Sequence, residues 1–182
     1  DATENDGFER CLCGHAIMLA REGIPAIYIQ SFLASRNDHW RVEHTGRNRS
    51  INRHIWQEGA LEAELSDTDS THARVFSELT RLLGLRKRQA AFHPNATQYT
   101  LHLGHEIFAF WRQSINRGQS IFCINNVTNR EQTVCLADIN LISTDDWQDL
   151  ISGQQFGEIG EFLTLRAYQS VWITSHILDA AE

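Results

Sequence analysis

The sequence lacks the features that would place the chain in a membrane, on nucleic acid or in a secretory pathway. No apolar run approaches the roughly 18 residues that a membrane-spanning helix needs, and no basic segment followed by an apolar core opens the chain. The formal net charge of −7 argues against a nucleic acid partner, unless a polar segment after residue 34 acts as a local basic patch. These absences predict a cytoplasmic globular protein with no membrane and no nucleic acid partner.

Cysteine is also scarce, with four in 182 residues. The pair Cys11 and Cys13 has no second pair at zinc-site spacing, so we expect no metal and no other cofactor. Cys123 and Cys135 could face each other across a hairpin, but a disulfide is not required and free thiols are favoured. The first residue is Asp1 rather than methionine, which suggests processing or a piece of a longer chain.

The N-terminal pattern predicts a helix followed by a buried strand. Asp6 and Glu9 have the spacing of a capping box, and apolar residues then recur at helical steps as far as residue 22. Gly23 and Pro25 mark the helix end. Residues 24–29 form a short, continuous apolar run, which is typical of a parallel strand buried on both faces. The residues before this helix contain no strand with which the predicted strand at residues 24–29 could pair.

A dense polar segment, residues 35–53, follows that predicted strand and is rich in Arg, Asn and His. A loop of this length is uncommon unless it has a function, and ligands of α/β proteins bind at the carboxyl ends of parallel strands. Helical patterns follow over residues 56–65, weakly, and 71–88, strongly. From residue 92 the apolar period changes to two, which predicts a small antiparallel β domain over residues 92–182. Its strands are expected near residues 99–103, 107–111, 121–124, 133–136 and 162–172, with hairpin turns at 116–119 and 125–131.

Several of these segments together resemble a known enzyme family. They are the G-I-P-A-I-Y-I-Q-S run, the S-R-N-D turn, the T-G-R-N-R-S-I-N-R loop and the L-R-K helix end. The chain resembles the C-terminal portion of the sucrose phosphorylase branch of glycoside hydrolase family thirteen, the α-amylase family. That branch includes phosphorylases of sucrose, sucrose phosphate, glucosylglycerol and glucosylglycerate. The resemblance implies an α/β plus all-β fold, in which the end of a (β/α)8 TIM barrel (helix, strand, helix) is followed by the β domain. Residues 1–91 would then belong to the barrel, with a substrate loop at residues 31–66.

The resemblance also implies a reaction. The family transfers an α-glucosyl group with retention, through a carboxylate nucleophile and a carboxylic acid, and phosphate takes the sugar as co-substrate. The family's three catalytic carboxylates lie in barrel strands that have no counterpart in these 182 residues. We therefore expect no catalytic residue and no catalysis from the chain alone, and we expect a missing N-terminal barrel portion as its partner. Such a barrel end would expose apolar surface and favour association.

The same resemblance assigns substrate binding to the polar loop. Arg49 stands where the family has an arginine that holds glucosyl hydroxyls, and a guanidinium fork suits vicinal hydroxyls. Asn37, Asp38 and Arg47 are candidates for acceptor or phosphate contacts. Plainer alternatives exist: Asp38 could cap a turn, and Arg49 and Arg53 could bind backbone carbonyls and neighbouring carboxylates.

A different function remains open. The chain could be a stand-alone carbohydrate-binding or interaction module left by truncation. Such a module would need an aromatic platform on the β domain, for which the candidates are Trp111, Trp147 and Trp172. Alternating aromatic residues in strands are more often core.

Overall fold

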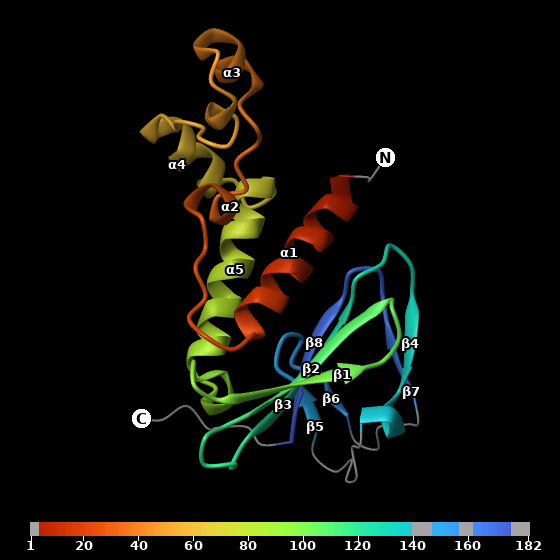
Figure 1. Cartoon of the computed structure of the whole chain (residues 1–182). Helices are drawn as coiled ribbons and strands as arrows, with labels where there is room; N and C mark the ends of the chain where they lie inside the picture. Colours follow the sequence, from red (N-terminus) through yellow and green to blue (C-terminus); the bar gives the residue numbers. More distant parts are fainter. Residues whose placement is uncertain (1–3, 140–146, 157–161, 176–182) are drawn as a thin grey trace. The chain divides into compact units, whose positions relative to one another are not determined.

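The structure, a computed structural model, describes residues 4–139, 147–156 and 162–175 (Figure 1). By its contacts the chain divides into two compact units, Asp1–Pro25 with Leu82–Glu182, and Ala26–Arg81. We call them the sheet unit and the loop unit. This grouping places the first helix with the β-sheets, whereas the sequence predicts a boundary between residues 91 and 92, which remains a prediction about the parent barrel.

The sheet unit contains the antiparallel β domain that the period-two pattern predicts. One sheet has the strand order β1-β2-β3-β8-β5-β6, and a second sheet pairs β4 with β7. All pairings are antiparallel. The strands are β1 (Thr97–His102), β2 (Ile107–Gln113), β3 (Ser120–Asn126), β4 (Gln132–Cys135), β5 (Trp147–Asp149), β6 (Gln155–Phe156), β7 (Phe162–Leu165) and β8 (Ser170–Thr174).

Strands β3 and β8 of the larger sheet are buried on both faces, which explains why β3 reads as a continuous apolar run. One face carries Ala109, Ile124 and Val171 in register, and these pack with Val134 of β4 and Leu165 of β7. The opposite face carries Phe110, Cys123 and Trp172, all fully buried. Because successive side chains of a strand point to opposite faces, a strand between two layers must be apolar at nearly every position.

Helix α1 (Glu4–Ala20) covers the second face and contacts β3 and β8 (Figure 1). Two arginines bind the backbone at the C-terminal end of this helix. Arg112 of β2 donates from Nη1 to the carbonyl of Ala20 at 2.6 Å. Arg86 of helix α5 (Thr71–Lys87) donates to the carbonyl of Leu19 and, at 3.0 Å, to that of Gly23. The last carbonyls of a helix have no partner within it, and a cation suits that end. Asp6 lies inside α1 rather than before it, so the predicted capping box is wrong.

Two strand expectations need correction. Residues 162–172 form two strands, β7 and β8, which belong to different sheets and are separated by a turn at 166–169. The expected hairpin across residues 125–131 does not form, because β3 pairs with β2 and β8 while β4 pairs with β7. The 116–119 turn does join paired strands, β2 and β3, as predicted. The four cysteines are free, as favoured.

The predicted strand over residues 24–29 is also wrong. Residues 24–28 have no regular secondary structure and pair with no strand in the described part of the chain, and helix α2 (Ile29–Phe32) follows at once. Ile24 is 85% exposed and Ile29 55%. A parallel strand needs neighbours for both its hydrogen bonds and its side chains, and none of the described strands lies beside this segment. The apolar run is present in the sequence, but its sheet is not formed here.

The loop unit is mostly short helices. They are α2, α3 (His39–Thr45), the 3-10 turn η1 (Asn48–Ser50), α4 (Glu58–Ser66) and the first part of α5. The segment expected to lack structure therefore holds a helix and a turn. Helix α4 corresponds to the weak pattern at 56–65 and α5 to the strong one at 71–88. Phe32 meets Phe76 edge-to-face at 5.0 Å, which anchors α2 to α5.

Candidate functional site

The polar segment is organised around helix α3. Asp38 is its N-cap and accepts a hydrogen bond from the Arg41 backbone N–H at 2.9 Å, while Gly46 ends it with φ +64° and an N–H bond to Val42 at 2.8 Å. A carboxylate before a helix and a left-handed glycine after it satisfy the orphan groups at both ends. The helix therefore forms despite having no buried residue.

Asp38 also joins α3 to the returning chain. Its backbone N–H donates to Ile51 at 2.7 Å, and its second carboxylate oxygen lies 3.4 Å from Nδ1 of His54. Both carboxylate oxygens thus have partners within the loop. These contacts are those of the capping alternative, although the side chain is not fully covered, at 17% exposure.

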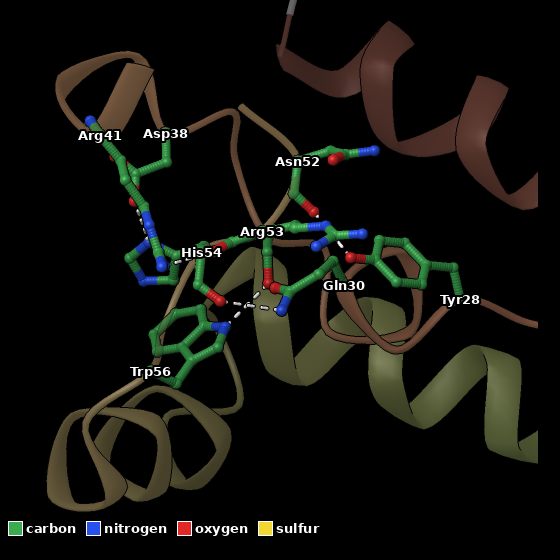
Figure 2. Close-up of polar contacts among 9 residues, drawn as sticks. Tyr28, Gln30, Asp38, Arg41, Asn52, Arg53, His54 and Trp56 are labelled. Atoms are coloured by element: carbon green, nitrogen blue, oxygen red, sulfur yellow. Dashed lines mark hydrogen bonds and ion pairs between the residues drawn. The ribbon is translucent and has the colours of Figure 1, made fainter. Parts of the chain in front are cut away.

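Three side chains hold the returning segment by its backbone, as Figure 2 shows. The Tyr28 hydroxyl donates to the carbonyl of Asn52, Arg41 Nη1 donates to that of Arg53, and Gln30 Nε2 donates to that of His54, each at 2.9 Å. These bonds hold the backbone of a segment that has no regular secondary structure. Each one gives a hydrogen-bond donor to a carbonyl that has no partner in a helix or sheet.

A row of three aromatic side chains in edge-on contact runs from His54 to helix α5. His54 meets Trp56 edge-on at 4.9 Å, Trp56 meets His72 of α5 in the same way at 5.0 Å, and His72 Nδ1 lies 2.7 Å from the carbonyl of Leu33. The Trp56 indole N–H donates to Ser35 Oγ at 2.8 Å. The rings are therefore fixed at both ends, which gives this region a rigid wall.

These residues enclose a hollow of about 860 Å³. Its lining combines aromatic, imidazole and charged groups: Arg36, Asn37, Asp38, His39, Trp40, Arg41, His44, Thr45, His54, Ile55, Trp56 and His72. Trp40 is largely exposed and stacks on His44 with ring centres 3.9 Å apart. Flat aromatic faces beside polar donors are suited to a small polar ligand such as a sugar.

The hollow brings together two of the four predicted site residues. Asn37 and Asp38 line it, whereas Arg47 and Arg49 do not. Arg49 lies in η1, is exposed, and has no side-chain hydrogen bond or ion pair with the described residues. Arg47 is exposed, and its bonds to described residues are made by its backbone: its N–H donates to Thr45 Oγ1 at 3.3 Å, and its carbonyl accepts from the Ser50 N–H at 2.9 Å. The sequence reasoning missed Trp40, His54, Trp56 and His72, for which the aromatic content of residues 39–56 was the available signal.

The described residues contain no group of three or more His, Cys, Asp or Glu placed to hold a metal ion. Within the same ranges, no helix has the length and apolarity to cross a membrane.

Known proteins resemble the chain in sequence over most of its length. A glucosylglycerate phosphorylase of Escherichia coli is 34% identical over 173 residues, which cover 93% of this chain and 29% of that protein. The enzyme of the same name from Spirochaeta thermophila is 33% identical over 177 residues, covering 91% and 30%. The chain is a relative of the glucosylglycerate phosphorylases. The resemblance to the sucrose phosphorylase branch is thereby confirmed, although the chain spans less than a third of these relatives, and no family model matches it.

Solved structures support the fold of this phosphorylase relative. An Anoxybacillus alpha-amylase superposes with a TM-score of 0.69 at 16% identity, covering 94% of this chain and 33% of that one. Trehalose-6-phosphate hydrolase of Bacillus licheniformis gives 0.66 at 18% identity, covering 91% and 38%. The fold is thus that of the C-terminal part of an α-amylase-family enzyme, with its small antiparallel β domain.

Proposed function

We propose that the chain supplies the glucosyl- and acceptor-binding end of a retaining phosphorylase that acts on a small α-glucoside such as glucosylglycerate. The observation that carries this proposal is the 34% identity to glucosylglycerate phosphorylases over 93% of the chain. The polar segment fits it, because a hollow lined by Trp40, Trp56 and several polar side chains is held there by a fixed backbone.

Arg49 is the residue that we assign to the glucosyl group. Its guanidinium is exposed, and a planar fork of five N–H donors can bind two vicinal hydroxyls in one plane. Asn37, Asp38 and Arg47 are assigned to the acceptor or to phosphate. Asp38 would do so while it caps α3, since its carboxylate is only partly covered.

In the proposed reaction the glucosyl group leaves the acceptor oxygen, forms a covalent ester with a carboxylate, and is transferred to inorganic phosphate as glucose 1-phosphate. The acceptor oxygen gains the proton that a carboxylic acid gives up, and phosphate returns one. Those carboxylates are not assigned to this chain, so the chain alone is proposed to be inactive. A cytoplasmic location and phosphate as the sole inorganic co-substrate, with no metal or other cofactor, complete the proposal.

The test compares the native polypeptide with the 182-residue chain, after the intact mass of the native polypeptide has been measured. Release of glucose 1-phosphate from glucosylglycerate and phosphate is expected from the native polypeptide and not from the chain alone. Arg49→Ala in the native polypeptide is expected to lower kcat/KM about a hundredfold, because several charge-assisted hydrogen bonds are lost. Arg81→Ala is the control, since Arg81 is exposed on α5 and its ion pair with Glu78 lies at the surface. Turnover by the 182-residue chain alone would refute the proposal.

One observation favours the alternative of a carbohydrate-binding module. Trp172 is fully buried and Trp147 nearly so, but Tyr99 of β1 is 47% exposed and stacks on Trp111 with ring centres 4.8 Å apart. A sugar could stack on that tyrosine. Glycan binding that survives Arg49→Ala and is lost in Tyr99→Ala would support this alternative over the phosphorylase proposal.

A further inference from the structure

A second hollow, in the sheet unit, takes no part in the proposed function. It lies where α5 ends and the chain turns toward β1, and its volume of about 760 Å³ is within the range of small-molecule sites, about 300–1,000 Å³. Every residue that lines it belongs to the sheet unit.

The charged part of its lining is of one sign. Arg86, Lys87, Arg88 and His93 line it, and no Asp or Glu does. None of these four side chains takes part in an ion pair with the described residues. In a chain of net charge −7, three unpaired cations in sequence are a local excess of positive charge.

Arg86 is the buried member of the set, at 8% exposure. Its guanidinium donates to the carbonyls of Leu19 and Gly23 and lies 5.8 Å from the centre of the Phe92 ring, with Arg112 at 5.9 Å from the same ring. Burial lowers the pKa of both arginines, and the charge of Arg86 adds to the lowering at Arg112. Neutral carbonyls and a ring face solvate the Arg86 guanidinium but do not neutralise it, and Arg112 adds positive charge beside the same ring without lining the hollow. A bound anion would therefore offset the desolvation of Arg86.

The rest of the lining is apolar. Ile24, Leu83, Phe92 and Pro94 contribute, and Ile24 keeps most of its surface in contact with water. An inorganic anion would leave this surface wet, whereas a ligand with a hydrocarbon body would cover it, at roughly 25 cal/mol per Å² of apolar area.

We propose that this basic hollow binds an organic anion with an apolar body, of the class of a medium-chain carboxylate, at a site separate from the polar loop. The cations at the end of α5 receive the carboxylate, and the apolar side chains from residues 24 and 83–94 receive the hydrocarbon. The proposal uses none of the residues that are assigned to the glucosyl group, the acceptor or phosphate.

The test is isothermal titration of the native polypeptide with octanoate, 1-octanol and inorganic phosphate. Octanoate is expected to bind with a stoichiometry of one molecule per chain, and more tightly than 1-octanol or phosphate. Lys87→Gln/Arg88→Gln removes two exposed cations and leaves Arg86 in place, and it is expected to weaken octanoate binding about tenfold. Arg130→Gln/Arg166→Gln makes the same change in net charge elsewhere on the sheet unit and is expected to leave binding within about twofold.

A third variant tests the hollow itself. Gly84 lines the hollow, and a Cβ added there meets no atom within 4 Å, so we expect the ring of Gly84→Phe to occupy part of the hollow while the helix is kept. It is expected to abolish octanoate binding with unchanged circular dichroism. The proposal is overturned if octanoate fails to saturate, if octanol or phosphate binds as tightly, or if the control pair weakens binding as much as the Lys87 and Arg88 pair.

Discussion

In the sheet unit, Arg86 and Arg112 are buried and donate to backbone carbonyls, whereas in the loop unit Arg47 and Arg49 are exposed. Arg112 is completely buried and reaches three carbonyls, while no side-chain bond of Arg49 occurs within the described residues. Arg112 thus stabilises the sheet unit, as the partly buried Arg41 does the loop segment, whereas Arg49 is left available for a ligand. Exposure, rather than residue type, separates structural arginines from candidate binding ones.

The two units also differ in how their chain is held. The sheet unit has layers on both faces of its main sheet, so its residues are stabilised by a shared core. The segment from Tyr28 to Trp56 relies on single hydrogen bonds from side chains to carbonyls. Because a core is lost all at once and single bonds are lost one by one, the loop segment should open locally well before the sheet unit unfolds.

The largest effect on stability is expected when the buried arginine of the sheet unit is removed. Arg112→Ala leaves the carbonyls of Ala20, His93 and Ala96 buried without their donor and opens a cavity, so we expect a loss of about 3–5 kcal/mol in the free energy of unfolding. Urea denaturation followed by near-UV circular dichroism measures it. Arg130→Ala, at an exposed site in the same unit, should change little. Equal, small effects at both sites would show that Arg112 is not a structural donor.

Asn126 tests the same unit without a charge. Its side chain is fully buried, donates to the carbonyls of Arg130 and Arg166 at 2.6 and 2.8 Å, and accepts from the backbone and hydroxyl of Thr128. Asn126→Ala should cost about 2–4 kcal/mol in the free energy of unfolding, because several buried groups lose their partner at once. Asn95→Ala is the matched control, since Asn95 is exposed and also sits in an Asn-x-Thr sequence. A loss at Asn95 as large as at Asn126 would contradict the buried network.

The sequence predicts the parts of this fold that depend on local pattern. Helix α5 follows from its apolar stripe, and the β domain from its period of two. The run at residues 24–29 has the right composition for a strand but lacks its neighbours, and no local pattern reveals whether neighbours are present. The pairing of β4 with β7, rather than β3, depends on contacts across 27 or more residues and was equally out of reach.

The local structure of the polar segment was not predicted from the sequence, and its role as a binding site stays a prediction. Asp38 and Gly46 are a cap and a stop for α3, yet the helix was missed because no apolar stripe lies between them. The wall of Trp56 and His72 joins residues 16 apart, which no periodicity links. Arg49 was singled out by resemblance alone, and its exposure is information that only the structure supplies.

Alkaline pH should destabilise the sheet unit selectively, because all four cysteines lie in it and none in the loop unit. Burial raises the pKa of the Cys123 thiol well above its ordinary value of 9.0. The folded state therefore keeps a proton that the unfolded state releases above pH 9.0, so stability is full below that pH and falls as pH rises toward the folded pKa. The slope from one such thiol is about 1.4 kcal/mol per pH unit at most.

Cys123→Ala should flatten this alkaline slope in urea titrations between pH 8 and pH 10, roughly the range in which an ordinary thiol titrates. Comparing slopes, rather than stabilities at one pH, removes the cost of the small cavity that the substitution leaves. Cys135→Ala is the matched control, because Cys135 is only partly buried. An unchanged slope in Cys123→Ala would mean that this thiol is not what holds the proton.

The smallest effect is expected at Asp38, and it sharpens the comparison most. Asp38→Ala removes the cap of α3 and the contact with His54, which should cost about 1 kcal/mol locally and raise amide exchange in α3 about fivefold. Amides of β3 should not change, because the sheet unit does not depend on that cap. Asp38→Asn keeps a cap acceptor of similar strength and loses only the charge, so amide exchange in α3 should stay near that of the original protein.

The same two variants separate ligand contact from positioning. If Asp38→Asn nevertheless weakens sugar binding in the native polypeptide, the carboxylate contacts the ligand while it caps the helix. If only Asp38→Ala weakens binding, Asp38 is a positioning residue, and the ligand contacts belong to its neighbours in the hollow. Faster amide exchange throughout β3 in Asp38→Ala would instead show that the two units open together as one cooperative structure.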